Sequence, residues 1–287
     1  MPCGMRFAHN CLTPCWHCVL APPDVSPPES FCMLTRRWVT DQVVPFNTEG
    51  MRQLIANEVP ALRIPAFATP GETKAFGEAI VARSRRTSSV PQVTRLGISQ
   101  YQQGIMGSKA EYFAAAVEAR EEYAAIFAAS FDPLSRFIGV LRAEGFDAGV
   151  MEEPGWGPYF AGTGKVRNGV SPIHVDFSPQ DSPDWAVGAL EAQLAWNYYV
   201  QVPPSGGELL LWDKVWEPAH DVHQAEESYW YHPTAVEGAP ELRVPVQAGE
   251  VLILNSRNFH AVAESADRLA YGSFIAVQGG GQLGLFS

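Results

Sequence analysis

The stretch Ile173-His174-Val175-Asp176-Phe177 decides how this chain is interpreted. Side chains on a β-strand alternate between its two faces, so His174 and Asp176 would point to one side and Val175 to the other. One imidazole and one carboxylate make a weak metal site, and a third ligand is needed from elsewhere. His260, which follows another apolar run, is the candidate for that third ligand.

Three protein ligands on one face of an octahedral ion leave the opposite face open, which is the arrangement of non-heme Fe(II) oxygenases. His-X-Asp alone is a weak signal, because three common residue types recur by chance. Neighbouring runs strengthen it. Residues 193–202 and 208–212 are strand-like and flank a Pro/Ser/Gly turn, which predicts a β-hairpin. Arg268 begins a further strand-like run, where a buried guanidinium could hold a carboxylate through two parallel hydrogen bonds.

This ordered set comprises a His-X-Asp strand, the run Ser205-Gly206-Gly207-Glu208-Leu209, a strand ending in His and an Arg-led strand. Over residues 155–278 it resembles the Fe(II)/2-oxoglutarate-dependent oxygenase superfamily. Within that superfamily the chain looks like the small-molecule branch, which holds the indole-alkaloid halogenases of cyanobacteria and hydroxylases of N-acylated amino acids. The halogenases carry Gly where this chain has Asp176, so the resemblance is to a hydroxylase. Ala270 departs from the family pattern, which often has Ser or Thr two residues after the Arg.

The resemblance implies a mainly β fold with flanking helices, the double-stranded β-helix or cupin-type jelly roll. It implies Fe(II), 2-oxoglutarate as cosubstrate and O2. His174, Asp176 and His260 would be the metal ligands, and Arg268 would hold the distal carboxylate of 2-oxoglutarate, with Asn197 as a second cosubstrate-binding residue. Oxidative decarboxylation would then drive hydroxylation of an unactivated C–H bond in a small molecule, for which an amino-acid-derived or other natural product is expected.

Phe177, Arg167 and Trp212 are the candidate substrate contacts. Phe177 adjoins the carboxylate ligand. Along residues 196–199, alternation places Trp and Tyr on one face and Asn and Tyr on the other, and the sequence does not say which pair faces the site. Ordinary core packing remains an alternative for each aromatic residue. Lys165 and Arg167 approach the strand of His174, where they would face either an anionic substrate or solvent.

The composition divides the chain. All five cysteines lie within residues 1–32, a Pro-rich leader that is expected to lack fixed structure or to fall outside the natural protein. A zinc knuckle around Cys15-Trp16-His17-Cys18 is the alternative. Residues 33–287 are expected to form one domain. In it, residues 33–150 would give mostly helical support and residues 151–287 the jelly-roll core.

Helix signals concentrate in the first half. A short helix is expected over residues 48–58, and Thr69-Pro70-Gly71-Glu72 has the pattern of a capping box with proline in the first turn. Ser108 opens a longer helical pattern through Phe131, and a further helix carries an apolar stripe over residues 134–141. These helices are expected to pack outside the sheet. The predicted stripe of the long helix consists of Phe113, Ala116, Val117, Ala124 and Phe127.

Two segments offer rival sites. Gly162-Thr163-Gly164-Lys165 lacks the phosphate-loop pattern and a following helix, which predicts a turn between strands. An insertion at residues 213–241 carries a second set of potential ligands, namely His220, Asp221, His223 and His232. Its polar surroundings indicate an exposed lid or interface, in which Trp230 and Tyr231 close over substrate. Metal sites need rigid support, which favours the strand-borne triad.

The formal net charge of −11 argues against nucleic acid or an anionic membrane as the main partner. No apolar run has the length of a membrane span and no secretory signal pattern opens the chain, so a cytoplasmic protein is expected, as monomer or homodimer. Alternatives remain: a 2-oxoglutarate-dependent desaturase or cyclase, a metal-dependent cupin enzyme without 2-oxoglutarate, and a non-catalytic jelly-roll binding protein.

Overall fold

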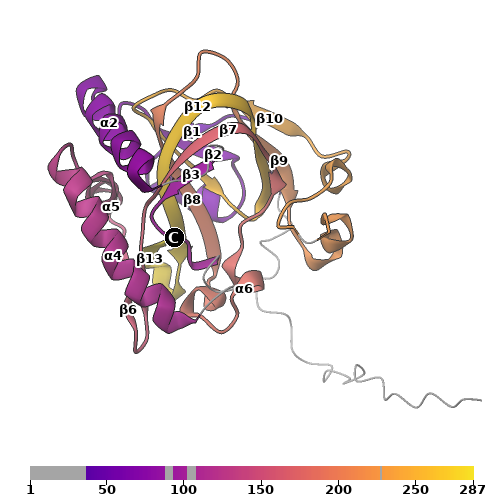
Figure 1. Cartoon of the computed structure of the whole chain (residues 1–287). Coiled ribbons are helices and arrows are strands. Elements are labelled where there is room, and N and C mark those ends of the chain that lie inside the picture. Colours follow the sequence, from indigo (N-terminus) through magenta and orange to yellow (C-terminus); the bar gives the residue numbers. More distant parts are fainter. Residues whose placement is uncertain (1–36, 88–92, 102–107, 227) are drawn as a thin grey trace, which may run out of the picture.

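The computed structural model of the chain describes residues 37–87, 93–101, 108–226 and 228–287. The leader of residues 1–32, with its alternative zinc knuckle, lies outside the described residues. In Figure 1 the strands curve into a barrel-like body, and three helices lie together on one side of it. These are α2 (Pro70–Thr87), α4 (Lys109–Ala128) and α5 (Pro133–Ala143).

Shorter helices and a separate hairpin surround the main sheet. Two shorter helices are α1 (Thr48–Ile55) and the one-turn α6 (Ser178–Asp181). A separate hairpin pairs β5 (Glu152–Glu153) with β6 (Gly157–Pro158). The strands of the main sheet are β1 (Val44–Pro45), β2 (Ala61–Ile64), β3 (Val93–Leu96), β4 (Ala148–Val150), β7 (Thr163–His174), β8 (Ala192–Gln201), β9 (Leu209–Val215), β10 (Glu241–Val244), β11 (Val251–Asn255), β12 (Asn258–Val277) and β13 (Leu283–Phe286).

Two long strands, β7 and β12, join the layers of the body. The second half of β12 pairs with β8 and the first half pairs with β9, while β7 follows β12 through both halves. Register shifts interrupt the β7–β12 ladder between His260 and Arg268. Such irregularities bend strands, so β12 passes from one layer into the other, as its arch in Figure 1 illustrates. The fold is the predicted double-stranded β-helix.

The predicted hairpin between residues 193–202 and 208–212 is wrong. Strands β8 and β9 exist, but they do not pair with each other, because each pairs with a different half of β12. Gly206 and Gly207 have φ of +77° and +76°, and the Gly207 N–H donates to the Glu264 carbonyl at the bend of β12. The two glycines therefore carry the chain across that bend into the other layer.

The limits of the other site strands also differ from expectation. Strand β7 already begins at Thr163, so the predicted turn over residues 162–165 is mostly strand. The expected Arg-led strand is the second half of β12, which starts before His260. Strand β7 ends at His174, and Asp176 lies just beyond it.

The helix starts follow the sequence signals. Thr69 and Glu72 exchange hydrogen bonds at the start of α2, and Ser108 and Glu111 form a capping box at the start of α4. The predicted stripe of α4 is partly wrong, because Val117 is 49% exposed. The helix is rich in alanine on all sides, so periodicity did not single out the buried face. Its buried residues are Tyr112, Phe113, Ala116, Ala119, Tyr123 and Ile126.

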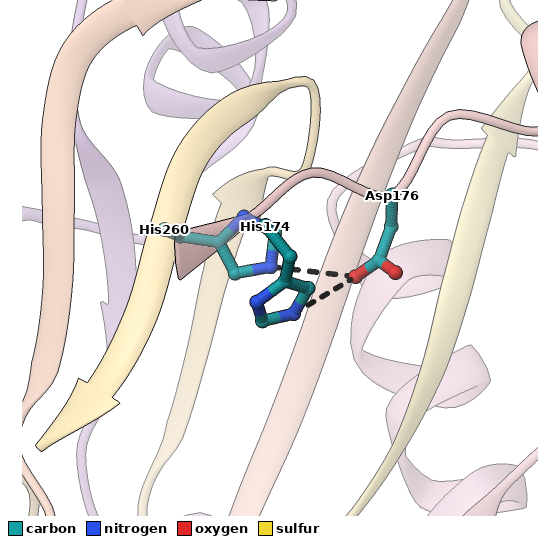
Figure 2. Close-up of side chains that lie close together, drawn as sticks. All are labelled: His174, Asp176 and His260. Atoms are coloured by element: carbon teal, nitrogen blue, oxygen red, sulfur yellow. Dashed lines mark ion pairs between the residues drawn. The ribbon is translucent and has the colours of Figure 1, made fainter. Parts of the chain in front are cut away.

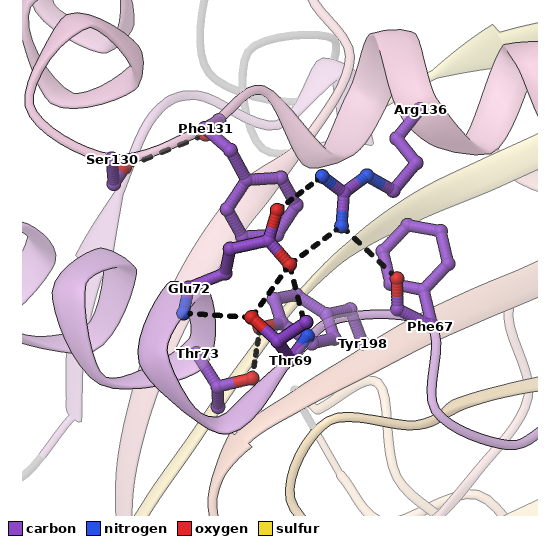
Figure 3. Close-up of polar contacts among 8 residues, drawn as sticks. All are labelled: Phe67, Thr69, Glu72, Thr73, Ser130, Phe131, Arg136 and Tyr198. Carbon is purple, nitrogen blue, oxygen red and sulfur yellow. Dashed lines mark hydrogen bonds and ion pairs between the residues drawn. The ribbon is translucent and has the colours of Figure 1, made fainter.

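One polar network fixes α2 against α5 (Figure 3). Arg136 donates from Nη2 to one Glu72 carboxylate oxygen at 2.5 Å and from Nη1 to the other at 3.1 Å. Arg136 also donates to the Phe67 carbonyl, and its guanidinium lies 4.2 Å from the centre of the Phe131 ring. A bidentate charge-assisted pair of this kind sets the relative position of two helices.

The helix layer determines which face of β8 looks into the barrel. Trp196 stacks on Phe137 of α5 with ring centroids 4.2 Å apart, and Tyr198 packs against Phe67. Both side chains therefore belong to the core between sheet and helices, and the alternate residues of β8 face the barrel interior.

Within the described residues no single helix is long and apolar enough to cross a membrane, while the bent pair α4 and α5 meets that criterion only when taken together.

Candidate functional site

The three predicted metal ligands lie together at one end of the barrel interior (Figure 2). His174 and His260 are opposite each other in the β7–β12 ladder, and their ring centroids are 4.2 Å apart. One carboxylate oxygen of Asp176 lies 3.3 Å from Nε2 of His260 and 3.8 Å from Nε2 of His174. Within the described residues this is the one group in which three potential ligand atoms converge.

Backbone carbonyls orient both imidazoles. Nδ1 of His174 lies 2.7 Å from the Pro172 carbonyl, and Nδ1 of His260 lies 2.9 Å from the Asn258 carbonyl. A carbonyl only accepts, so each Nδ1 carries the proton and each Nε2 keeps its lone pair toward the shared space. Metal-binding histidines are commonly fixed by such a second contact.

Asp176 is positioned by the turn between β11 and β12. Its N–H donates to the Ser256 carbonyl at 2.9 Å, and the Ser256 hydroxyl donates back to the Asp176 carbonyl at 2.9 Å. These two bonds extend the pairing of β7 beyond its last strand residue. The side chain of Asp176 thereby reaches the same space as the two imidazoles, although it does not lie on the strand.

The pKa values of His174 and Asp176 favour the binding of a cation at the triad. Burial, together with His260, lowers the pKa of His174 to about 3, so this imidazole is neutral at physiological pH. Burial alone would raise the pKa of Asp176, but the adjacent His260, together with His174 and Lys165, holds it below the usual range. Neutral imidazoles and an ionised carboxylate are the protonation states in which these groups bind metal.

The triad opens into a cavity of about 380 Å³ between the two layers. A cavity of this size is within the range of small-molecule sites. Of the predicted site residues outside the triad, Arg268, Asn197, Phe177 and Arg167 line it, together with the other inward residues of the sheet. Trp212 does not line it, and its side chain instead packs in a buried cluster with Trp216 and Phe259.

Arg268 is a buried cation that lines this cavity. The residue is 5% exposed, and its guanidinium lies 5.1 Å from the centre of the Tyr199 ring. Among the described residues, neither Nε of Arg268 nor the hydroxyl of Tyr199 has a hydrogen-bond partner, and Arg268 has no acidic partner. A buried, unsatisfied donor pair of this kind is costly unless a ligand completes it. The arrangement fits a carboxylate.

The insertion at residues 213–241 covers one side of the site. Tyr229 stands edge-on to His174 with ring centroids 5.6 Å apart, and the Tyr231 N–H donates to the Ile173 carbonyl at 2.7 Å. Tyr231 lines the cavity, whereas Trp230, which was also expected to do so, packs its ring against His232. The covering role predicted for the insertion is thus carried by Tyr229 and Tyr231.

The rival ligand set of the insertion does not converge within the described residues. Asp221 instead accepts hydrogen bonds from Trp216 at 2.9 Å and Tyr231 at 3.0 Å. His220 accepts the Glu217 N–H, and His223 contacts Thr234. These side chains hold the insertion together.

Several lining residues carry no sequence signal that predicts them. Arg95 of β3 and Asp181 of α6 both border the cavity. Burial, with Asp176 and Asp221, raises the pKa of Asp181 to about 7. The segment around β3 carried no clear periodicity, and only its pairing with β7 reveals that Arg95 points inward.

Known proteins resemble this chain over most of its length. The family model described as carrier-protein-independent halogenase WelO5 matches residues 47–280. The leucinostatins biosynthesis cluster protein S of Purpureocillium lilacinum is 28% identical over 221 residues, covering 72% of this chain and 89% of that protein. The L-gamma-glutamyl-L-propargylglycine hydroxylase of Streptantibioticus cattleyicolor is 32% identical over 186 residues, covering 61% and 66%.

The fold also occurs in a solved structure. The crystal structure of an N-substituted L-amino acid dioxygenase from Burkholderia ambifaria superposes with a TM-score of 0.60 at 19% identity, covering 86% of this chain and 97% of that one. At this identity the similarity concerns the fold alone.

Proposed function

The chain belongs to the family of the carrier-protein-independent halogenase WelO5, and we propose that it uses Fe(II), 2-oxoglutarate and O2 to hydroxylate a C–H bond of a small molecule. One observation carries this proposal. The cluster of His174, Asp176 and His260 shares a cavity with an unsatisfied buried pair, Arg268 and Tyr199. The first set suits a divalent metal and the second suits the far carboxylate of a dicarboxylate cosubstrate.

Different side chains would bind the metal and the cosubstrate. When bound, Fe(II) with 2-oxoglutarate and O2 supplies the oxidising power that replaces C–H by C–OH, with succinate and CO2 as coproducts. His174 and His260 would hold the ion through Nε2 and Asp176 through a carboxylate oxygen, and three protein ligands of this kind would leave room for the cosubstrate and O2. Arg268 donates to the distal carboxylate, and Tyr199 adds its hydroxyl as a further donor. Asn197, which lines the same wall, is proposed as the second cosubstrate contact.

Asp176 favours hydroxylation over halogenation. In the halogenases that the sequence resembles, Gly at this position leaves a coordination position for chloride. Here the carboxylate of Asp176 points at both imidazoles and would fill that position. The hydroxylase among the curated relatives supports the same reaction type and an amino-acid-derived substrate.

The walls near the triad exclude water and aim the substrate. Phe177 is held by Arg257, whose guanidinium lies 4.5 Å from the centre of the Phe177 ring and whose Nε donates to the Trp216 carbonyl. Tyr229 covers His174 from the insertion. We propose Phe177 and Arg167 as substrate contacts. The cytoplasmic location, the oligomeric state and the single-domain organisation of residues 33–287 remain predictions.

An anaerobic titration tests the proposal. Fe(II) and then 2-oxoglutarate are added to the apoprotein, and the weak visible charge-transfer absorption of the chelate is followed. The parent protein should develop this absorption, His174→Ala should not, and Arg268→Met should need much more 2-oxoglutarate. Iron binding without any absorption on addition of 2-oxoglutarate would instead indicate a metal-dependent cupin enzyme, and failure to bind iron would indicate a binding protein.

A further inference from the structure

A row of inward-facing side chains crosses the cavity wall beside the cosubstrate position. Arg95 of β3 is directly opposite Lys165 of β7, Lys165 is opposite Ala270 of β12, and Ala270 is opposite Tyr199 of β8. Directly opposed residues of antiparallel strands share one face of the sheet. All four line the cavity, so Arg95 and Lys165 face the same space as the Arg268–Tyr199 pair.

The next row adds two more cations. Arg167 of β7 is opposite Arg268 of β12, and both line the cavity. Among the described residues that line it, the side-chain carboxylates are those of Asp176 and Asp181. Within the described lining, four basic side chains therefore face two acidic ones. A divalent metal and dianionic 2-oxoglutarate would offset each other, which leaves a surplus of positive charge in a partly dry space.

The pKa of Lys165 reflects this surplus of positive charge. Burial, with the charges of Arg95, lowers the pKa of Lys165 to about 8, even though Asp176 acts in the opposite direction. Arg167 and Arg268 add to the lowering. A lysine with a matched counter-ion would shift the other way. The wall is thus short of negative charge near Lys165.

Lys109 and Arg63, which are also partly buried, have acidic partners. Lys109 contacts Glu153 at 2.6 Å, and Arg63 contacts Glu250 at 2.9 Å. By contrast, the ammonium of Lys165 forms neither a hydrogen bond nor an ion pair within the part of the chain that the structure describes. An uncompensated ammonium in a cavity is unfavourable unless a ligand neutralises it. Its partner is therefore expected to come from outside the chain.

We propose that Arg95 and Lys165 form a subsite for a carboxylate of the substrate, separate from the Arg268–Tyr199 subsite for 2-oxoglutarate. This inference rests on the proposed function and narrows its substrate class to small carboxylic acids. A planar guanidinium beside an ammonium supplies parallel donors and a point charge, which together match a carboxylate. Arg95 is also close enough to Asp176 for the carboxylate charge to influence it. A carboxylate held there lies on the triad side of the cavity.

The apolar part of such a substrate has a place as well. The same cavity is also lined by Ala195, Leu254, Val262, Ala270 and Phe274. Small side chains there leave room, and larger apolar ones suit an aliphatic or aromatic group. A carboxylate anchored on Arg95 and Lys165 would let the rest of the molecule extend over this surface toward the metal position.

The test compares acids with their neutral analogues in the holoenzyme. Parent protein with Fe(II), 2-oxoglutarate and O2 is given a panel of N-acetylated L-amino acids with aliphatic or aromatic side chains, each as the free acid and as the primary carboxamide. Substrate-stimulated succinate formation gives kcat and KM for each member. Free acids should stimulate with KM values about 10- to 100-fold below those of their amides, the range of one or two charge-assisted hydrogen bonds.

Variants assign this preference to the subsite. In Lys165→Met and in Arg95→Met, KM for the acid should rise about 10- to 100-fold while KM for the amide stays near the parent value. Lys165→Arg should retain most of the preference. Arg243→Gln serves as the matched control, because its guanidinium lies outside the cavity and is 61% exposed beside Glu241. Thermal unfolding of each variant verifies that it is folded.

Three results would overturn the subsite: amides that stimulate as well as acids, acid KM values unchanged in both methionine variants, or a panel in which no free acid stimulates. Failure of the proposed function has a different signature. In that case the parent protein would form no succinate above the protein-free background under any condition and would show no chelate absorption with Fe(II) and 2-oxoglutarate.

Discussion

Replacing Arg268 separates a 2-oxoglutarate-dependent oxygenase from other metal-binding jelly rolls. The guanidinium is 5% exposed, faces the Tyr199 ring and has no acidic partner among the described residues. A dicarboxylate cosubstrate needs a cation at its far end, whereas a metal alone does not. Arg268→Lys and Arg268→Met should therefore weaken 2-oxoglutarate binding and leave iron affinity nearly unchanged, since Arg268 is not in the triad.

The size of the effect follows from the lost contacts. A charge-assisted hydrogen bond contributes about 1.5–3 kcal/mol. Lysine keeps the charge but loses the parallel donors, so Arg268→Lys should raise the half-saturating 2-oxoglutarate concentration by roughly one to two powers of ten. Arg268→Met removes charge and donors together and should raise it further. Tyr199→Phe removes one hydroxyl donor and should cost about 1 kcal/mol, roughly a fivefold change.

Succinate formation against 2-oxoglutarate concentration, at fixed iron, measures these shifts. Thermal unfolding with and without 2-oxoglutarate under anaerobic conditions gives a second readout, because a ligand that binds only the folded state raises the unfolding temperature. Without 2-oxoglutarate, Arg268→Met should unfold at or above the parent temperature, since it removes a buried cation that has no counter-ion. Loss of the ligand-induced increase would then report binding alone.

Arg167→Met is the matched control for this prediction. Arg167 is opposite Arg268 in the ladder and lines the same cavity, but its guanidinium also contacts the Val170 carbonyl at 3.4 Å. Its replacement should shift half-saturation far less. If Arg268→Met kept the parent value and Arg167→Met or Lys165→Met lost it, the carboxylate clamp would lie on β7 and the assignment of Arg268 would be wrong.

Three further outcomes are expected. His174→Ala and His260→Ala should each abolish iron binding, measured by metal analysis, while retaining cooperative unfolding; metal stoichiometry equal to that of the parent would contradict the triad. Glu72→Gln should lower the free energy of unfolding at pH 7 by about 1 kcal/mol, because glutamine keeps the cap contact but loses the charge that pairs with Arg136. Hydrogen bonding to Arg136 lowers the pKa of Glu72 to about 2 from 4.5, so this contribution is complete above about pH 4.5 and disappears as pH falls toward 2; an equal difference between parent and variant at both ends would disprove it. Gly206→Ala should destabilise the fold strongly, because its Cβ would meet the Glu264 carbonyl at 2.0 Å and its φ is +77°, and denaturant unfolding with a parent-like midpoint would refute this.

The ligand set followed from sequence although part of the reasoning did not hold. Strand alternation was expected to place His174 and Asp176 on one face, yet β7 ends at His174. Two hydrogen bonds with Ser256 continue the extended pairing beyond the strand and deliver Asp176 to the same space. Local spacing thus predicted which residues meet. The contact that makes them meet comes from a distant turn, which no local pattern encodes.

The pairing partners of β8 and β9 could not be predicted from the sequence for a related reason. The Pro/Ser/Gly run at residues 203–207 has the composition of a hairpin turn, and β8 and β9 do flank it. Whether the flanking strands pair depends on β12, which begins about fifty residues later and pairs with β9 through its first half and with β8 through its second. The face of β8 that points into the cavity also depends on a remote partner. Trp196 stacks on Phe137 in the helix layer, so the alternate residues of β8 face the cavity.

Net charge shows most clearly what composition can and cannot predict. A formal charge of −11 makes a polyanionic partner unfavourable over most of the surface, and that exclusion stands as an expectation. It does not describe the cavity, where Arg95, Lys165, Arg167 and Arg268 converge from three strands. A low-dielectric wall concentrates the field of these few charges, so a small anion would respond to the cavity far more than to the distant acidic surface. An acidic chain can therefore select an acidic substrate. The ratio of KM for the amide to KM for the acid measures how strongly the positive charges of the cavity favour the acid.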